Sequence, residues 1–236
     1  MALRSTLICA IACLSSLQAI ARDPADAAVA PVETTSAWMQ GLDAAEVDGV
    51  AASEWTERWW RWVHAFPPGL LPYQDRDGRR CTIGQEGRVW FLAGTDGSFD
   101  ARRTCRVPKD VWLLVPVINM IHFGPAHGGR SCAALKAAAA TNNDHLRSAV
   151  AILDGDALPS RAVRRLRVDG CFNLLPSRHG IDGMRAAADG YWLLLPPLSP
   201  GRHVLSVGAN YGAPGSAYGA MVQNFEYTLE VGGPEI

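Results

Sequence analysis

The chain has 236 residues, a formal net charge of −1, 48% hydrophobic residues and 19% charged residues. This composition excludes a largely disordered chain, because apolar side chains are plentiful enough to form a core. The near-neutral charge argues against a general nucleic-acid binder and against a polybasic membrane anchor. No apolar stretch after residue 21 is long enough for a transmembrane helix, so none is expected in the mature protein.

The first 21 residues have the pattern of a signal peptide. Arg4 supplies a basic start, residues 7–17 form an apolar run, and Ala-Ile-Ala at 19–21 fits the small-x-small rule for cleavage. We therefore expect an exported protein, either periplasmic or secreted. Residues 22–50 are expected to form a flexible leader that ends in a short helix, and residues 51–236 a single β-rich domain.

Four cysteines remain after the signal peptide. An even number of cysteines in an exported chain predicts disulfide bonds. Four cysteines allow three pairings, and we favour Cys81–Cys105 with Cys132–Cys171 because each closes a short loop that does not cross the other. A structural zinc site is not expected, since no C-x-x-C spacing occurs. No metal or other cofactor is expected.

The strongest predicted helix covers residues 53–65, with Ser53 as the expected cap and Pro67-Pro68 as its end. Its large apolar residues follow one helical stripe, which predicts that this stripe packs on a sheet. They are Trp55, Trp59, Trp62, Val63 and Phe66. Trp60 lies off the stripe and is the tryptophan of the helix that we consider first for ligand binding. The alternative to a packed stripe is that the tryptophans of this helix are exposed and form an aromatic platform for a sugar ring or a membrane interface.

After this helix the periodicity changes to short apolar or alternating runs bounded by Gly, Pro, Asn and Asp, which is typical of strands. The runs cover residues 88–93, 111–118, 150–153, 164–168, 191–195, 203–208 and 225–231. Asp154-Gly155 predicts a hairpin turn, and residues 131–141 a second short helix. The strand spacing favours a mainly β, Ig-like or β-sandwich-type domain.

Several motifs resemble those of a widespread group of exported bacterial proteins to which no activity is assigned. The resemblance covers about residues 53–231, and it implies export and a β-rich domain but no catalytic residue. The motifs are the Trp-rich helix, Q-E-G at 85–87, V-W-F-L-A-G-T at 89–95, R-T-C-R-V-P at 103–108, P-V-I-N at 116–119, D-G-Y-W at 189–192 and L-L-P-P-L at 194–198.

Candidate functional residues are few. The candidate ligand-binding residues are Trp60, Tyr211, Glu54, His122 and His127. Tyr211 lies in a Gly-rich segment, 208–219, that we expect to be a loop. His122 and His127 are expected in a loop after Asn119, where two histidines with this spacing do not indicate a metal site.

The sequence contains none of the common nucleophile, zinc-protease or phosphate-loop motifs. We therefore expect a non-catalytic binding or structural module, with a glycan or another envelope component as its partner. The alternative is a secreted, glycan-directed hydrolase with an uncommon carboxylate or histidine site. Its carboxylates would come from Glu54, Asp182 and Asp189, because two carboxylates across a cleft are able to hydrolyse a glycoside.

Overall fold

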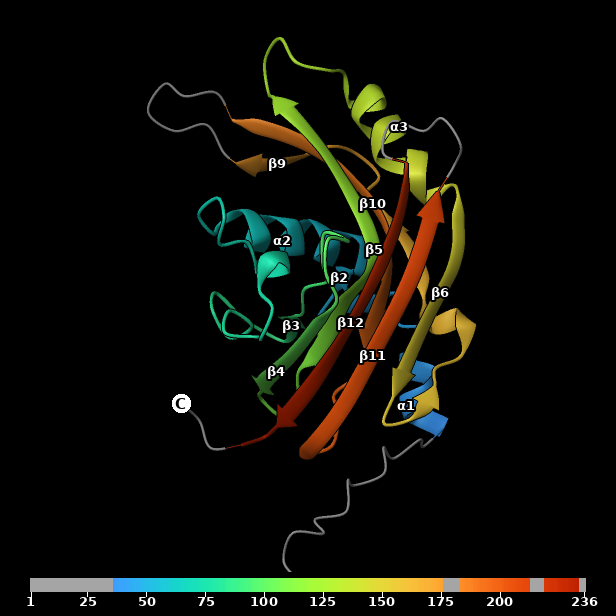
Figure 1. Cartoon of the computed structure of the whole chain (residues 1–236). Helices are drawn as coiled ribbons and strands as arrows, with labels where there is room; N and C mark the ends of the chain where they lie inside the picture. Colours follow the sequence, from blue (N-terminus) through green and yellow to red (C-terminus); the bar gives the residue numbers. More distant parts are fainter. Residues whose placement is uncertain (1–35, 176–182, 213–218, 234–236) are drawn as a thin grey trace, which may run out of the picture.

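The computed structural model describes residues 36–175, 183–212 and 219–233, and two β-sheets dominate it (Figure 1). The expected signal peptide, and the expected leader up to residue 35, lie outside these residues. The sheets face each other as a sandwich, so the prediction of a mainly β, sandwich-type fold is confirmed. Within the described residues, no helix combines the length and the apolar character needed to cross a membrane.

The first sheet is built on the antiparallel pair of β5 (Trp112–Pro125) and β10 (Met184–Leu195). Its strands, in spatial order, are β3 (Val89–Phe91), β5, β10 and β8 (Arg164–Arg167), and β9 (Phe172–Leu175) also pairs with β10. β10 is antiparallel to β5, β8 and β9, while β3 is parallel to β5.

The second sheet contains, in spatial order, β4 (Ala101–Val107), β12 (Ala220–Val231), β11 (Gly201–Gly212), β6 (Leu146–Leu153) and β7 (Asp156–Ala157). β4 is parallel to β12, and the other pairs are antiparallel. Asp154 and Gly155, both with positive φ, form the expected turn between β6 and β7. β12 buries alternate residues, as the sequence predicts for a strand with one exposed face.

Two hydrophobic cores lie on opposite faces of the first sheet. Leu193 and Leu195 of β10 belong to the core between the two sheets, whereas Trp192 and Leu194 belong to the core beneath helix α2. Because both faces of β10 are covered, its run of consecutive apolar residues needs no polar alternation.

Helix α2 (Ala52–His64) forms a third layer against the first sheet (Figure 1). Trp55, Trp59, Trp62 and Val63 are buried, which confirms that the stripe packs on the sheet. Trp60 is also buried, at 6% exposure, so its position off the stripe does not leave it on the surface. The predicted cap is wrong: Ala51 is the N-cap residue, and it makes no side-chain cap bond.

The part of the expected flexible leader that the structure describes, residues 36–50, contains secondary structure and buried side chains. α1 (Ser36–Gly41), β1 (Glu46–Val47) and β2 (Val50–Ala51) precede the helix, and Leu42 and Val47 are buried. Trp55 Nε1 donates to the Val47 carbonyl at 3.2 Å. Residues 36–50 therefore pack against the domain.

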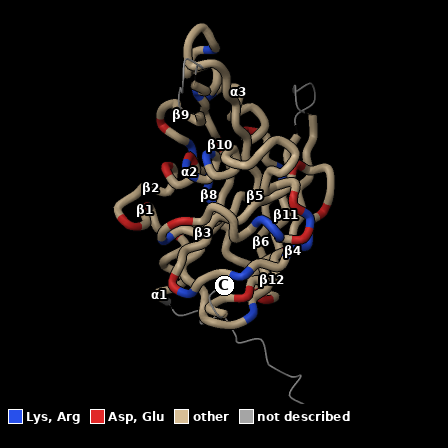
Figure 2. Tube along the Cα trace, turned by 90° about the vertical axis from the view of Figure 1, so that its left-hand side faces the viewer, with Lys and Arg blue, Asp and Glu red and all other residues tan. Residues whose placement is uncertain are grey.

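The second expected helix is α3 (Cys132–Asn143), with Ser131 Oγ accepting the Ala134 N–H at 3.2 Å as its cap. Disulfides join Cys81 to Cys105 and Cys132 to Cys171, the pairing that the loop lengths favour. Two short 3₁₀ turns, η1 (Pro72–Gln74) and η2 (Ser160–Ala162), complete the described elements. Figure 2 shows acidic and basic residues interspersed along the trace, in agreement with the near-neutral net charge.

Candidate functional site

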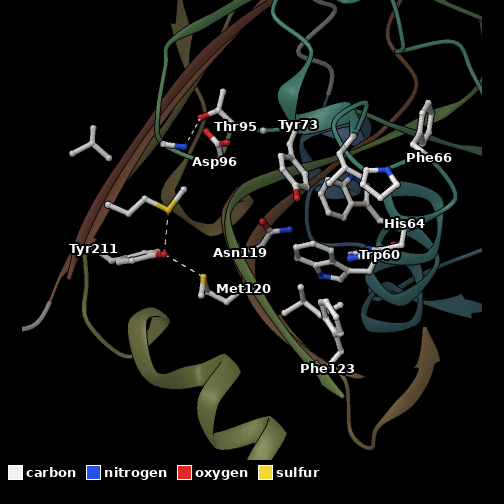
Figure 3. Close-up of a pocket in the computed structure, with 18 of the residues that line it drawn as sticks. Trp60, His64, Phe66, Tyr73, Thr95, Asp96, Asn119, Met120, Phe123 and Tyr211 are labelled. Atoms are coloured by element: carbon white, nitrogen blue, oxygen red, sulfur yellow. Dashed lines mark hydrogen bonds between the residues drawn. The ribbon is translucent and has the colours of Figure 1, made fainter. Parts of the chain in front are cut away.

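A pocket of about 840 Å³ opens where α2 meets one end of the sandwich (Figure 3). It lies between the C-terminal half of α2 with the turn that follows, the loop after β3, and the ends of β5, β11 and β12. Its lining residues are Trp59, Trp60, His64, Phe66, Pro68, Leu71, Tyr73, Gly94, Thr95, Asp96, Gly97, Asn119, Met120, Ile121, Phe123, Leu175, Tyr211, Ala220, Met221 and Val222.

One wall of the pocket is aromatic. The Trp60 ring packs edge-on against Trp59, with ring centroids 4.8 Å apart, and its centroid lies 5.9 Å from that of His64. Phe123, 44% exposed at the mouth, packs edge-on against His64 at 5.5 Å. Figure 3 shows Tyr73 on the same side of the cavity as these rings. The wall therefore presents several aromatic surfaces to a ligand.

His64 is a neutral imidazole in this wall. Its Nδ1 lies 2.9 Å from the Trp60 carbonyl, and because a carbonyl only accepts, Nδ1 carries the proton. Burial lowers the pKa of His64, and the hydrogen bond to Trp60 offsets this only in part. No positive charge is therefore expected on His64 at neutral pH.

The opposite side of the pocket joins the two sheets. The Tyr211 hydroxyl of β11 contacts the sulfur atoms of Met120 on β5, at 3.2 Å, and of Met221 on β12, at 3.1 Å. These contacts are the dashed lines at Tyr211 in Figure 3. Tyr211 is 2% exposed, so it closes the gap between the sheets and forms part of the pocket wall.

A buried arginine positions the two segments that carry Tyr73 and Asp96. Arg103 of β4 donates through Nε to the Asp75 carbonyl at 2.7 Å and through Nη1 to the Ala93 carbonyl. It also donates to the Tyr227 hydroxyl at 3.0 Å. One side chain thus holds both the turn after α2 and the loop after β3. Next along this loop, the Thr95 N–H donates to Gln223 Oε1 at 2.8 Å.

Asp96 carries the pocket's formal charge. Among the lining residues in the described part of the chain, it is the single Asp, Glu, Lys or Arg. Its Oδ1 accepts from the Ser98 N–H at 3.0 Å and from the Ser98 hydroxyl at 2.5 Å. Burial, followed by the negative charge of Asp96, raises the pKa of Tyr73. The pocket is therefore weakly negative.

Two buried side-chain donors of residues that line the pocket have no acceptor among the described residues. They are Trp60 Nε1 and Asn119 Nδ2, both buried. Most buried polar groups in folded proteins are hydrogen-bonded, so these two donors are exceptions beside the cavity.

The structure brings two of the five candidate residues together in this pocket, Trp60 and Tyr211. Glu54 lies on the exposed face of α2, where its carboxylate accepts from Arg58 at 2.7 Å. His122 and His127 do not line the pocket. The expected loop positions of His122 and Tyr211 are wrong, because β5 continues to Pro125 and β11 to Gly212.

The carboxylates considered for hydrolysis are held in different ways. Asp189 is 3% exposed and lies on β10, not in a loop. It accepts from Arg165 at 2.8 and 2.9 Å and pairs with Arg167 at 2.8 Å. Glu54 and Asp189 are thus each engaged by arginines outside the pocket, and Asp182 lies outside the described residues.

A Ser-His-Asp arrangement that the sequence does not reveal occurs at the start of β11. His203 Nδ1 lies 2.7 Å from Asp154 Oδ2, and Ser199 Oγ lies 3.4 Å from His203 Nε2. However, Nε2 lies closer to the Ser199 carbonyl, at 2.8 Å, than to the Ser199 hydroxyl. The imidazole therefore faces a backbone carbonyl, and its contact with the serine hydroxyl is longer than the nucleophile–base hydrogen bond of a triad. The cluster fixes the β10–β11 turn.

Comparisons of the chain with protein-family models, with curated proteins and with solved structures find no match. The residues that sequence reasoning missed, above all Tyr73, Asp96, Asn119 and Phe123, come from three separate segments. A Thr-Asp-Gly-Ser turn at 95–98 is the one local signal that would have directed attention to Asp96.

Proposed function

We propose that this protein is an exported, non-catalytic binding module of the cell envelope or extracellular space, and that its ligand occupies the pocket beside α2. The observation that carries the proposal is the aromatic pocket that contains both Trp60 and Tyr211. Its volume of about 840 Å³ falls in the range of small-molecule sites.

The proposal of export rests on the signal-like first 21 residues, and the two disulfides are compatible with an oxidising compartment. A glycan or another envelope component fits the aromatic wall, because sugar rings and other apolar faces stack on indole and phenol rings. The apolar rim, where Phe123, Leu175 and Val222 are 44%, 43% and 56% exposed, favours a ligand with an apolar part.

Co-sedimentation tests the binding proposal. The mature protein is incubated with envelope and plant polysaccharides, peptidoglycan and lipid vesicles, and each sample is assayed for retained protein and for released soluble product. We expect retention without product, and a several-fold loss of retention in Phe123→Ser. Ile83→Ser is the matched control, because Ile83 is 51% exposed and does not line the pocket.

If Phe123→Ser and Ile83→Ser change the amount of retained protein equally, the pocket has no role in the binding. Release of soluble product would support the alternative, a secreted hydrolase. In that case Glu54→Gln and His122→Asn become the informative variants, since these residues are the sequence-based candidates for catalysis.

A further inference from the structure

Among its described lining residues, the pocket combines aromatic rings that no arginine covers with a single negative charge. We propose, on the basis of the proposed binding function, that its ligand is an organic cation with an apolar body, of the alkylated or quaternary ammonium class. Three observations carry this inference: the charge of the lining, the aromatic wall, and the way in which arginines cover other rings of the protein.

The charge of the lining disfavours an anion. Asp96 supplies the one formal charge among the described lining residues, which include neither lysine nor arginine. In the described chain, no basic group lies within ion-pair distance of the Asp96 carboxylate. Its Oδ1 accepts from Ser98, which keeps the carboxylate oriented without neutralising it.

The aromatic wall supplies the second component of a cation site. Quaternary ammonium groups are bound over the faces of Trp, Tyr and Phe, where the ring quadrupole attracts positive charge. Trp60, Tyr73 and Phe123 line the cavity together. His64, the remaining titratable ring in this wall, is kept neutral by burial and therefore does not repel a cation. Figure 3 shows Asp96 and the aromatic wall on different sides of the same cavity.

The arginines of this protein provide an internal comparison. Five aromatic rings carry an arginine guanidinium over their face in the described structure. They are Trp55, Phe99, Phe172, Tyr191 and Tyr227, with distances of 4.0 to 5.7 Å. None of these five rings lines the pocket.

By contrast, no arginine of the described chain lies over Trp60, Phe66, Tyr73 or Phe123. These rings line the same cavity as Asp96, whose carboxylate has no ion-pair partner among the described residues. The fold therefore leaves a cation position open at this site while it fills such positions elsewhere.

A matched pair of small probes isolates the charge. Choline and 3,3-dimethylbutan-1-ol have nearly the same shape, but only choline carries a positive charge. We expect choline to bind about fivefold more tightly in an NMR titration, since a cation–π contact contributes about 1 kcal/mol. Asp96→Asn keeps the acceptor for Ser98 and removes the charge, so choline affinity should fall several-fold while the affinity of the neutral probe stays unchanged.

Control variants distinguish the site from general electrostatics. Asp156→Asn removes an exposed negative charge away from the pocket and should leave both affinities unchanged. Phe123→Leu keeps apolar bulk but removes a ring, and it should weaken choline binding only. In the absence of ligand, Asp96→Asn should lower the pKa of Tyr73, measured by ultraviolet titration, because the carboxylate favours the neutral phenol.

The outcomes separate the two proposals. Equal affinity for choline and its neutral analogue, with no effect of Asp96→Asn, would overturn the cation inference. If a neutral saccharide is retained in a manner sensitive to Phe123→Ser, the binding function stands and the cation inference is wrong. If no probe or polymer responds to any pocket substitution, both proposals are wrong.

Discussion

Three neighbouring tryptophans of α2 allow the contribution of an indole hydrogen bond to be measured in one helix. Trp60 and Trp62 are each 6% exposed. Trp62 Nε1 donates to the Ile83 carbonyl at 2.8 Å, whereas Trp60 Nε1 has no acceptor. Replacing each by Phe removes the same atoms from sites of equal exposure, so the difference between the two variants reports the hydrogen bond.

The magnitude follows from the hydrogen bond that only Trp62 makes. A net hydrogen bond contributes about 0.5–1.5 kcal/mol, and leaving a buried carbonyl without its donor costs about 1–3 kcal/mol. Trp62→Phe should therefore lower the free energy of unfolding by about 2 kcal/mol more than Trp60→Phe. For a protein of this size, this corresponds to a difference in Tm of about 4–8 °C.

Urea unfolding followed by far-ultraviolet circular dichroism measures both variants, since tryptophan fluorescence changes with the substitution itself. Trp59→Phe is the third member of the series. Its Nε1 donates to the Leu92 carbonyl at 2.7 Å, so this variant should group with Trp62→Phe. Equal losses at Trp60 and Trp62, or a larger loss at Trp60, would refute the assignment of the Trp60 indole as an unsatisfied donor.

Two further predictions concern pH and backbone packing. Burial lowers the pKa of His64 and, with the Arg130 charge, of His122, so each imidazole protonates more readily in the unfolded chain, where its pKa is about 6.5. The free energy of unfolding should thus fall as the pH drops through about 6.5, the pKa of histidine in the unfolded chain, and the fall should be smaller in His64→Asn and in His122→Asn. A Cβ at Gly190 would lie 2.4 Å from Asn119 Cβ, so Gly190→Ala should lower the free energy of unfolding by about 1–3 kcal/mol and weaken ligand binding. The control is Gly124→Ala, which should do neither, because no atom lies within 4 Å of the added Cβ. Equal Tm values for the two variants would contradict this prediction.

The regular elements were the predictable part of the fold. All seven expected apolar runs overlap strands of the sandwich. Such strands can be recognised from a few neighbouring residues, because an alternating or continuous apolar run is visible in the local sequence. The sequence did not predict β4 (Ala101–Val107), which alternates buried and exposed residues as a strand should. Its buried positions include Arg103, a charged residue that conceals the apolar pattern and is satisfied only by carbonyls and a hydroxyl distant in sequence.

Strand ends were predicted less well for a related reason. β5 and β11 continue through His122 and Tyr211, where glycines and polar residues break the apolar pattern. Pairing with β10 and β12 keeps these segments extended. The ends of these two strands are therefore set by pairing with neighbouring strands that lie far away in the sequence, and not by the local composition.

The pocket itself depends on contacts that no local pattern contains. Trp60 lines the cavity from a buried position at the edge of α2, and it is not an exposed platform. Asp96 and Tyr73 reach the same cavity because Arg103 holds the loop of one and the turn of the other. Thr95 and Arg103 lie in the sequence motifs at 89–95 and 103–108, whereas Tyr73, Asp96 and Phe123 lie outside all the motifs that the sequence analysis singled out. The motif residues therefore support the shape of the cavity through their hydrogen bonds, and side chains outside the motifs supply much of its chemistry.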